Sequence, residues 1–231
     1  MNCLVITGAS SGIGLATATA FHEAGYQIIN ISRRPCDLPG ALDLSCDLAD
    51  PNAIDRIAPT LQAKTQHASS LCLIHNAAQL AHDTVQEVQA QALRQVYEIN
   101  LIAPTVLNRL LLPGMQPGSS IIYIGSTLGE KAVPGSFSYV TSKHASIGMM
   151  RATCQDLAGS GIHTACVNPG FTDTEMLRDH IPADVMPDIA AMSTFGRLIE
   201  PAEIGQAVLF AAQSPVINGS VINADLGQIQ R

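Results

Sequence analysis

The sequence predicts an α/β fold over residues 1–231: one domain built on a doubly wound, mostly parallel sheet of seven strands, with helices on both faces. Short apolar runs of strand length alternate along the chain with longer segments whose apolar residues recur at helical spacing. The strand-like runs are apolar along their whole length. This is typical of parallel strands, because each parallel return needs a crossover that covers a face of the sheet.

Each predicted element follows from this alternation. The predicted strands are 4–6, 27–31, 41–44, 71–74, 120–124, 163–167 and 220–223. The predicted helices are 13–24, 51–64, 86–112, 139–158 and 201–213. Pro51 and Pro201 mark helix starts, since proline is tolerated in a first helical turn. The irregular stretch 171–199 follows a strand, and we expect it to overlie the ligand crevice as a substrate lid.

Composition and charge exclude several classes of protein. The chain has 231 residues, 47% hydrophobic and 13% charged, which is enough to bury a sizeable core. Its formal charge of −7 disfavours general binding to nucleic acid. No apolar stretch approaches the roughly 20 residues of a bilayer span. The chain opens on a strand-like run without a signal-peptide pattern, so we expect a cytoplasmic protein with no membrane partner.

The cysteines and histidines form no pattern that indicates chemistry. The six cysteines contain no CxxC pair, and the seven histidines contain no HExxH motif. A cytoplasmic chain of this size needs no disulfides. We therefore expect reduced cysteines in the core and no metal site.

A glycine-rich turn follows the first strand. Residues 7–14 read TGASSGIG, and helical spacing continues from Leu15. Gly8 permits a tight turn, Gly12 lets the backbone approach a diphosphate, and Gly14 allows close packing of helix on strand. The phosphates would meet the amino end of the helix, where free N–H groups favour anions. The turn predicts a dinucleotide site, and it lacks the Gly-Lys-Ser/Thr of a P-loop.

With this turn the chain resembles the classical short-chain dehydrogenase/reductase family, whose signature turn is Thr-Gly-x-x-x-Gly-x-Gly. Further segments match the family in order along essentially the whole chain: Asp47-Leu48, His75-Asn76-Ala77-Ala78, the set Asn100, Ser126, Tyr139 and Lys143, and residues 169–174. The resemblance implies a Rossmann fold and a homodimer or homotetramer packed through helices 86–112 and 139–158. His75 and Ala78 depart from the family's Asn-Asn-Ala-Gly, and residues 223–227 match its Val-Asp-Gly-Gly ending loosely.

The residues expected around the cofactor come from these segments and from the end of the second strand. They are Gly8, Ser10, Ser11, Gly12, Ile13, Gly14, Ser32, Arg33, Arg34, Asp47, Leu48, Asn76, Ala77, Ala78, Tyr139, Lys143, Pro169, Gly170, Thr172 and Thr174. By resemblance, Asp47-Leu48 contacts the adenine and residues 169–174 wrap the nicotinamide. The resemblance also implies that Lys143 holds the nicotinamide ribose and that Asn100 anchors a water for proton supply.

The Tyr139 and Lys143 pair has a chemical reason of its own. Residues four apart share one helix face, so the two side chains can converge. Free tyrosine is too weak an acid for efficient proton transfer near neutral pH, and a nearby ammonium stabilises the phenolate. Ser126 follows the strand 120–124, at the strand end where open α/β sheets bind ligands. We expect hydride to pass from the nicotinamide to a ketone or aldehyde carbon while Tyr139 protonates the oxygen and Ser126 polarises it. The reverse reaction would oxidise an alcohol.

The end of the second strand indicates which cofactor binds. An NAD enzyme carries an acidic residue there for the ribose hydroxyls, whereas this chain has Ser32-Arg33-Arg34. Two guanidinium groups can hold a 2′-phosphate through charge-assisted bonds. NADP(H) is therefore expected over NAD(H), although Ser11 stands where many NADP-preferring relatives have a basic residue.

The leading hypothesis is an NADPH-dependent carbonyl reductase. The alternative is a catalytically silent NADP(H)-binding redox sensor, against which the intact Ser126, Tyr139 and Lys143 argue. The expected pocket wall is mainly apolar, which suits a carbonyl on a hydrophobic or extended body. It comprises Gln79, Leu128, Val133, Phe171, Met176 and Leu177. The substrate itself and the direction of the reaction stay open.

Overall fold

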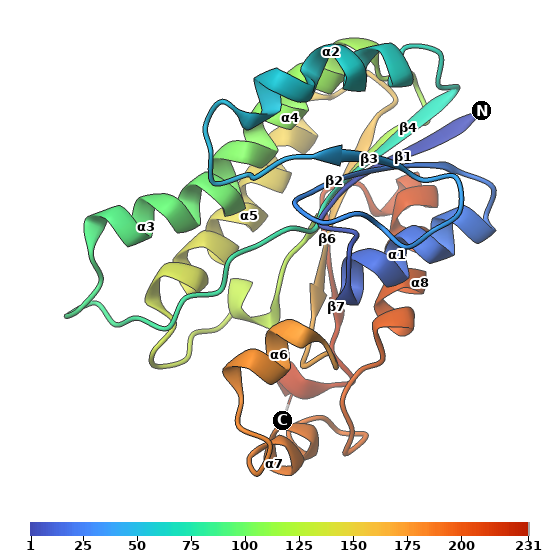
Figure 1. Cartoon of the computed structure of the whole chain (residues 1–231). Helices are drawn as coiled ribbons and strands as arrows, with labels where there is room; N and C mark the ends of the chain where they lie inside the picture. The colour runs from blue at the N-terminus through green and yellow to red at the C-terminus, as the bar shows by residue number, and fades with distance from the viewer. Residues whose placement is uncertain (231) are drawn as a thin grey trace.

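A seven-stranded parallel sheet forms the centre of the protein in the computed structural model, which describes residues 1–230 (Figure 1). The strands are β1 Asn2–Thr7, β2 Gln27–Ser32, β3 Leu42–Ser45, β4 Ser70–His75, β5 Ser120–Ile124, β6 His163–Pro169 and β7 Ser220–Ala224. They lie in the order β3-β2-β1-β4-β5-β6-β7, and every neighbouring pair is parallel. The order reverses direction between β1 and β4, where doubly wound sheets place a ligand crevice. The predicted fold class is confirmed.

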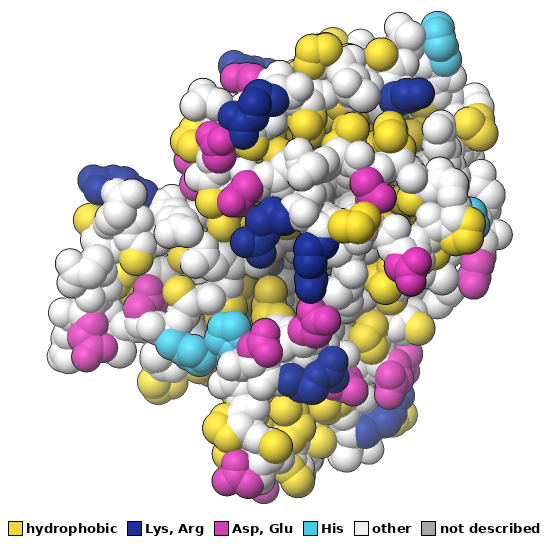
Figure 2. Space-filling model, in the orientation of Figure 1, with side chains coloured by type: hydrophobic (Ala, Val, Ile, Leu, Met, Phe, Trp, Pro, Cys, Tyr) yellow, Lys and Arg dark blue, Asp and Glu magenta, His cyan; other side chains and the backbone are white. Residues whose placement is uncertain are grey.

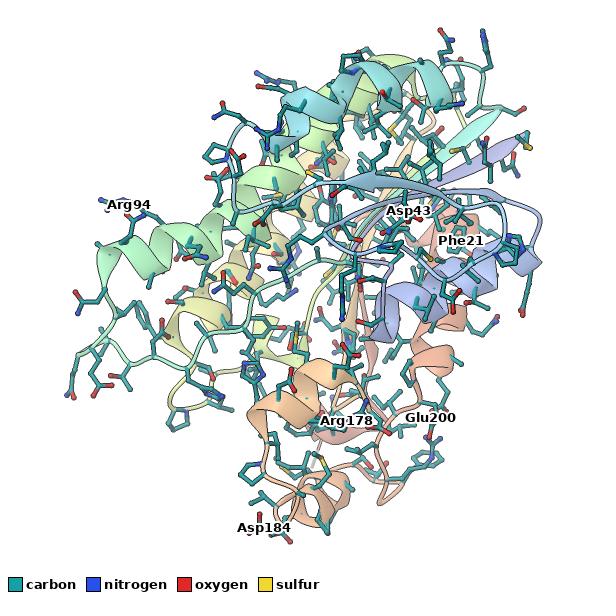
Figure 3. The ribbon with its side chains drawn as sticks, in the orientation of Figure 1. Phe21, Asp43, Arg94, Arg178, Asp184 and Glu200 are labelled. Atoms are coloured by element: carbon teal, nitrogen blue, oxygen red, sulfur yellow. The ribbon has the colours of Figure 1, made fainter. Side chains whose placement is uncertain are left out.

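Helices cover both faces of the sheet. They are α1 Gly12–Glu23, α2 Ala53–Thr65, α3 Ala90–Tyr97, α4 Ala103–Leu111, α5 Phe137–Asp156, α6 Glu175–His180, α7 Met186–Ala191 and α8 Pro201–Gln213. In Figure 1, α1 and α8 lie side by side on one face, and α2, α4 and α5 lie on the other. Successive strand residues point to opposite faces, so each apolar strand contributes side chains to two hydrophobic cores, one on each face of the sheet. In β1, Val5 packs on the side of α2 and α4, whereas Leu4 and Ile6 pack with Phe21 of α1 (labelled in Figure 3).

The predicted helix 86–112 is wrong as one continuous helix. Regular helix begins only at Ala90, and a π-helical turn at Glu98–Ile102 separates α3 from α4. Ala103 donates its N–H to the carbonyl of Glu98, five residues back. Pro104 follows and has no N–H, so the carbonyl of Asn100 loses its ordinary partner. The proline therefore accounts for the break, and Asn100 lies inside the π turn.

The segment 171–199 forms a separate lobe at the carboxyl ends of the strands. It contains the short helices α6 and α7, and the described end of the chain lies beside it (Figure 1). Asp184 lies at the far tip of this lobe (Figure 3). Helix α5 begins at Phe137, two residues before the predicted start, which places Tyr139 in its first turn. Within residues 1–230, no helix combines the length and apolarity that crossing a bilayer would need.

Candidate active site

The glycine turn after β1 is tightly built around three glycines. Gly8 and Gly12 have φ angles of 74° and 54°, a region that favours glycine. A Cβ on Gly14 would lie 2.1 Å from the carbonyl oxygen of Gly8. The Asn76 side chain, from the end of β4, donates to the carbonyls of Thr7 at 2.9 Å and Gly8 at 3.1 Å. The turn therefore needs glycine at these positions and is fixed by the neighbouring strand.

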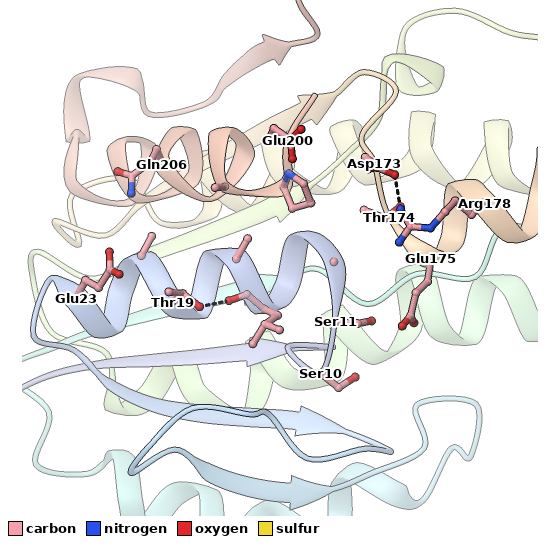
Figure 4. A pocket seen from close by; sticks show the side chains of 16 residues that line it. Ser10, Ser11, Thr19, Glu23, Asp173, Thr174, Glu175, Arg178, Glu200 and Gln206 are labelled. Carbon is pink, nitrogen blue, oxygen red and sulfur yellow. Dashed lines mark hydrogen bonds and ion pairs between the residues drawn. The ribbon is translucent and has the colours of Figure 1, made fainter. Parts of the chain in front are cut away.

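The first turn of α1 has the features of an anion site. Its N-cap residue, Ser11, has extended backbone, and its side chain makes no capping hydrogen bond. The first N–H groups of the helix therefore lack a side-chain acceptor, which suits a phosphate group. A groove of about 700 Å³ begins here and runs between α1 and α8. Figure 4 shows Ser10, Ser11 and Thr174 at one end of this groove and Glu23 and Gln206 at the other.

This turn fits the diphosphate of a dinucleotide. Gly12 leaves its Cβ position empty, and a Cβ there would lie 3.2 Å from Thr174. A side chain at residue 12 would therefore occupy space between the turn and the segment after β6. The open N–H groups and this space together are what a diphosphate requires.

Arg34, two residues past the end of β2, lies close to the glycine turn. Nη2 of Arg34 is 3.2 Å from Oγ of Ser11, which accepts its hydrogen bond, and 3.2 Å from Oε2 of Glu175 in α6. The Arg34 and Glu175 side chains are 63% and 58% exposed. Arg33 is also exposed. Figure 2 shows basic side chains grouped near the centre of this face, above the lobe of α6 and α7, with acidic side chains beside them. Positive charge is therefore available beside the groove, partly balanced by Glu175.

Ser126 lies just past the end of β5 and is held by its backbone. Its N–H donates to Oδ1 of Asn168, in the adjacent strand β6, at 3.1 Å. Its hydroxyl oxygen accepts from the N–H of Leu128 at 3.1 Å. This contact uses a lone pair and leaves the hydroxyl proton free to be donated. Ser126 can thus offer a hydrogen bond to an oxygen at the edge of the sheet.

Tyr139 and Lys143 lie on one face of α5, as their spacing predicts. Lys143 is 4% exposed, and its Nζ donates to the carbonyl of Ile124 at the end of β5 at 2.7 Å. The same Nζ lies 5.5 Å from the centroid of the Tyr139 ring. A buried ammonium needs partners, and a carbonyl and an aromatic face supply them here. The lysine also ties α5 to the strand that precedes Ser126.

Asn100 is buried in the π turn and holds the loop after β4. Its Oδ1 accepts from the N–H of Gln79 at 2.8 Å, and its Nδ2 donates to the carbonyl of Gln79 at 3.1 Å. The same Nδ2 donates to Oγ of Ser142 at 2.9 Å, and Ser142 donates to the carbonyl of Tyr139 at 2.8 Å. The structure therefore connects Asn100 to α5 through one serine.

The remaining positions expected around the cofactor lie along the same edge of the sheet. The N–H groups of Asn76 and Ala77 both donate to Oγ1 of Thr7 at 3.0 Å. Thr174 caps α6 by accepting from the N–H of Leu177. Asp47 is exposed, whereas Leu48 is 7% exposed and packs into the core.

The residues expected to line the substrate pocket do not line one common cavity among those described here. Gln79 is bound to Asn100, and Leu128 to Ser126. Phe171 pairs with Ile199 through backbone hydrogen bonding, and Met176 is 40% exposed on the lobe. A cavity of about 340 Å³ at the lobe is lined by other residues: Lys131, Asp188, Ala191, Met192 and Gln228.

His75, which departs from the family motif, belongs to a buried polar network beneath this edge. Asn108 donates to the hydroxyl of Tyr123 at 2.7 Å, so its Oδ1 faces Nε2 of His75 at 2.8 Å. Nε2 therefore carries the hydrogen, and Nδ1 is buried without a partner. Burial lowers the pKa of His75 to about 4. The imidazole is thus held neutral.

Three residues at this edge were not predicted from the sequence. Asn168 orients Ser126, Glu175 pairs with Arg34, and Asp83 accepts hydrogen bonds from the first turn of α5. Glu175 directly follows the matched segment 169–174, which was the only local signal for it. Asn168 directly precedes the same matched segment, whereas Asp83 lies in a stretch without a distinctive pattern.

The chain is similar to known proteins over nearly its whole length. A family model described as enoyl-(acyl carrier protein) reductase matches residues 8–228. Carbonyl reductase family member 4 of Xenopus laevis is 30% identical over 232 residues, covering 96% of this chain and 95% of that protein. The 3-oxoacyl-(acyl-carrier-protein) reductase FabG of Thermotoga maritima is 30% identical over 243 residues, covering 98% and 97%.

The solved structures include angucycline C-6 ketoreductase LanV with bound NADP. It superposes with a TM-score of 0.87 at 26% identity, covering 99% of this chain and 96% of that one. The chain belongs to the short-chain dehydrogenase/reductase family. It is an oxidoreductase of that family.

Proposed function

We propose that the protein is an NADP(H)-dependent carbonyl reductase that converts a ketone or aldehyde to an alcohol, or catalyses the reverse. The observation that carries this proposal is the position of Lys143, which lies between Tyr139 and the end of β5. Lys143 is buried against the Tyr139 ring and bound to the end of the strand that precedes Ser126. A relative named carbonyl reductase, of nearly equal length, supports the same reaction class.

Each residue has a distinct proposed role. The nicotinamide, when bound, supplies or accepts the hydride. Ser126 donates a hydrogen bond from its hydroxyl to the carbonyl oxygen, and so orients and polarises the carbonyl. Tyr139 gives its phenolic proton to that oxygen as negative charge develops, and the Lys143 ammonium stabilises the phenolate that remains. Asn100 holds the loop at Gln79 and, through Ser142, the backbone of Tyr139.

The preference for NADP(H) rests on charge at the end of β2. Arg33 and Arg34 stand where a carboxylate would serve NAD, and Arg34 lies within hydrogen-bonding distance of Ser11 in the glycine turn. A guanidinium group binds phosphate by charge-assisted hydrogen bonds. The NADP bound to the ketoreductase LanV supports the same choice. In this proposal residues 169–174 flank the nicotinamide, and Gln79, Leu128, Phe171 and Met176 contact the substrate.

Two further expectations belong to the proposal. A homodimer or homotetramer would pack through the segments 86–112 and 139–158, which contain α3, α4 and most of α5. A cytoplasmic location is supported by the six free cysteines, which suit a reducing compartment.

The test is oxidation of NADPH and NADH against a panel of ketones, aldehydes, diketones and β-ketoacyl thioesters, with Tyr139→Phe as the blank. The proposal expects NADPH to be consumed faster than NADH, and the blank to lose about 10²-fold or more in kcat. Full turnover by Tyr139→Phe would refute the mechanism. Faster turnover with NADH would refute the cofactor assignment.

A further inference from the structure

The loop between β4 and α3 reaches the amino end of α5 (Figure 1). Asp83 in this loop donates its N–H to the carbonyl of Gly135 at 3.1 Å, and its own carbonyl accepts from the N–H of Phe137 at 3.1 Å. Phe137 is the first residue of α5. The loop and the start of the helix are thus paired through their backbones.

The Asp83 carboxylate adds a second, bidentate contact. Oδ1 accepts from the N–H of Ser138 at 2.9 Å, and Oδ2 accepts from the Ser138 hydroxyl. Ser138 is completely buried. Hydrogen bonds to an ionised acceptor are roughly twice as strong as neutral ones, and a carboxylate is also favoured at a helix amino end. Asp83 therefore holds the first turn of α5 at two atoms of one residue.

Helix α5 has no equivalent support from its own sequence. Its N-cap residue, Ser136, makes no side-chain capping bond. Asp83 lies 55 residues away from Ser138 in the chain and supplies a cap from another element. Tyr139 directly follows Ser138, so Asp83 binds the same helical turn that carries the Tyr139 side chain.

The other end of the same loop is bound to Asn100. Gln79 exchanges both of its backbone hydrogen bonds with the Asn100 side chain, at 2.8 and 3.1 Å. The short segment 79–83 is therefore fixed at one end to the π turn and at the other to α5. A displacement of Asp83 would loosen the position of Tyr139 relative to Asn100 and Ser126.

We propose that Asp83 is a positioning residue for catalysis: its carboxylate fixes the first turn of α5 and so sets the place of the Tyr139 hydroxyl. This inference rests on the proposed function, in which Tyr139 is the acid. Proton transfer requires close placement of the reacting groups, and a misplacement of about 1 Å can cost about 10²-fold in rate. Asp83 does not need to touch the substrate or the cofactor.

The test compares kcat, KM for the carbonyl substrate and affinity for NADPH in Asp83→Ala, Asp83→Asn and Ser138→Ala, using the best substrate of the panel. Asp83→Ala should lose about 10- to 100-fold in kcat with NADPH affinity within about twofold of wild type. Asp83→Asn should recover most of the rate, because Oδ1 can still accept from the Ser138 N–H and Nδ2 can donate to its hydroxyl. Ser138→Ala, which keeps the backbone bond, should be intermediate.

Asp156→Ala is the matched control. Asp156 is exposed at the opposite end of the same helix, so its removal should leave kcat unchanged. If Asp83→Ala fails to fold, the Asn and Ser138 variants decide the question. A near-wild-type kcat for Ser138→Ala, together with a loss of kcat in Asp83→Asn, would then overturn the proposal.

The outcomes separate this inference from the proposed function. Wild-type kcat in Asp83→Ala, beside an inactive Tyr139→Phe, would refute the role of Asp83 alone. A parallel loss of kcat and NADPH affinity that Asp83→Asn does not rescue would indicate general damage and also refute it. Full activity of Tyr139→Phe would refute the proposed function and this role with it.

Discussion

Arg34 and Glu175 form an ion pair between the end of β2 and the first turn of α6, with Nη2 3.2 Å from Oε2. The same Nη2 lies 3.2 Å from the Ser11 hydroxyl. Glu175 therefore shares the guanidinium that is expected to bind the 2′-phosphate of NADP(H). Its negative charge would also repel that phosphate, so the pair connects the candidate lid to cofactor preference.

We expect Glu175→Gln to tighten the binding of NADPH relative to NADH, because the arginine is released and the repulsion removed. Arg34→Ala should weaken the binding of NADPH by about tenfold and leave the binding of NADH almost unchanged. A charge-assisted hydrogen bond contributes about 1.5–3 kcal/mol, and solvent exposure of the arginine reduces this contribution. Dissociation constants from fluorescence titration would measure both. Equal effects on the two cofactors would contradict the assignment of Arg34.

Gly14→Ala should abolish dinucleotide binding and destabilise the protein. Its Cβ would lie 2.1 Å from the Gly8 carbonyl oxygen and 2.5 Å from Nδ2 of Asn76, so the turn would have to open. Overpacking of this kind costs about 1–3 kcal/mol or more. Thermal unfolding and NADPH titration would measure the two effects. Gly114→Ala is the control, since its added Cβ meets nothing within 4 Å, and it should behave as wild type.

Stability should fall in acid because of His75. In the unfolded chain this histidine binds a proton when the pH falls below 6.5, its ordinary pKa. In the folded protein burial lowers that pKa to about 4. The unfolded state therefore binds more protons between these values, and stability present above pH 6.5 is lost as the pH falls towards 4. The full loss is about 3 kcal/mol, at about 1.4 kcal/mol per pH unit.

Urea unfolding at pH 7.5 and pH 4.5 would measure this loss. A His75→Asn variant should lose clearly less stability between the two pH values than wild type. His67→Asn, at an exposed position, serves as the control. An unchanged pH dependence in His75→Asn would show that another group is responsible.

Thiol labelling should separate one cysteine from the rest. Burial raises the pKa of Cys3, Cys36, Cys46 and Cys166 to about 11 and that of Cys72 to about 12, whereas Cys154 is partly exposed. Only a thiolate reacts readily. At pH 8 the native protein should take up one equivalent of reagent quickly and the other five only on unfolding. Peptide mapping would identify the first site, and rapid labelling of a core cysteine would contradict the packing.

Local patterns were sufficient for the strands, the glycine turn and the placing of Tyr139 beside Lys143. Apolar runs predict buried parallel strands because parallel sheets are covered on both faces. Three glycines could be assigned because each backbone requirement is local, and the spacing of four residues sets one helix face. The prediction of one continuous helix over 86–112 was wrong because a single proline, Pro104, changes the hydrogen bonding of the turn before it.

Only the tertiary structure decided how the site is held. Asn168 orients Ser126 across 42 residues of sequence, Asp83 caps Ser138 across 55, and Glu175 reaches Arg34 across 141. Each pair joins different elements at the carboxyl edge of the sheet. A single polar side chain in a loop or near the end of a strand or helix carries no periodic signal of its partner, since that partner is set by how strands and helices pack. The sequence by itself determined the sheet, the glycine turn and the residue types at the candidate site, and packing decided the orientation of those side chains.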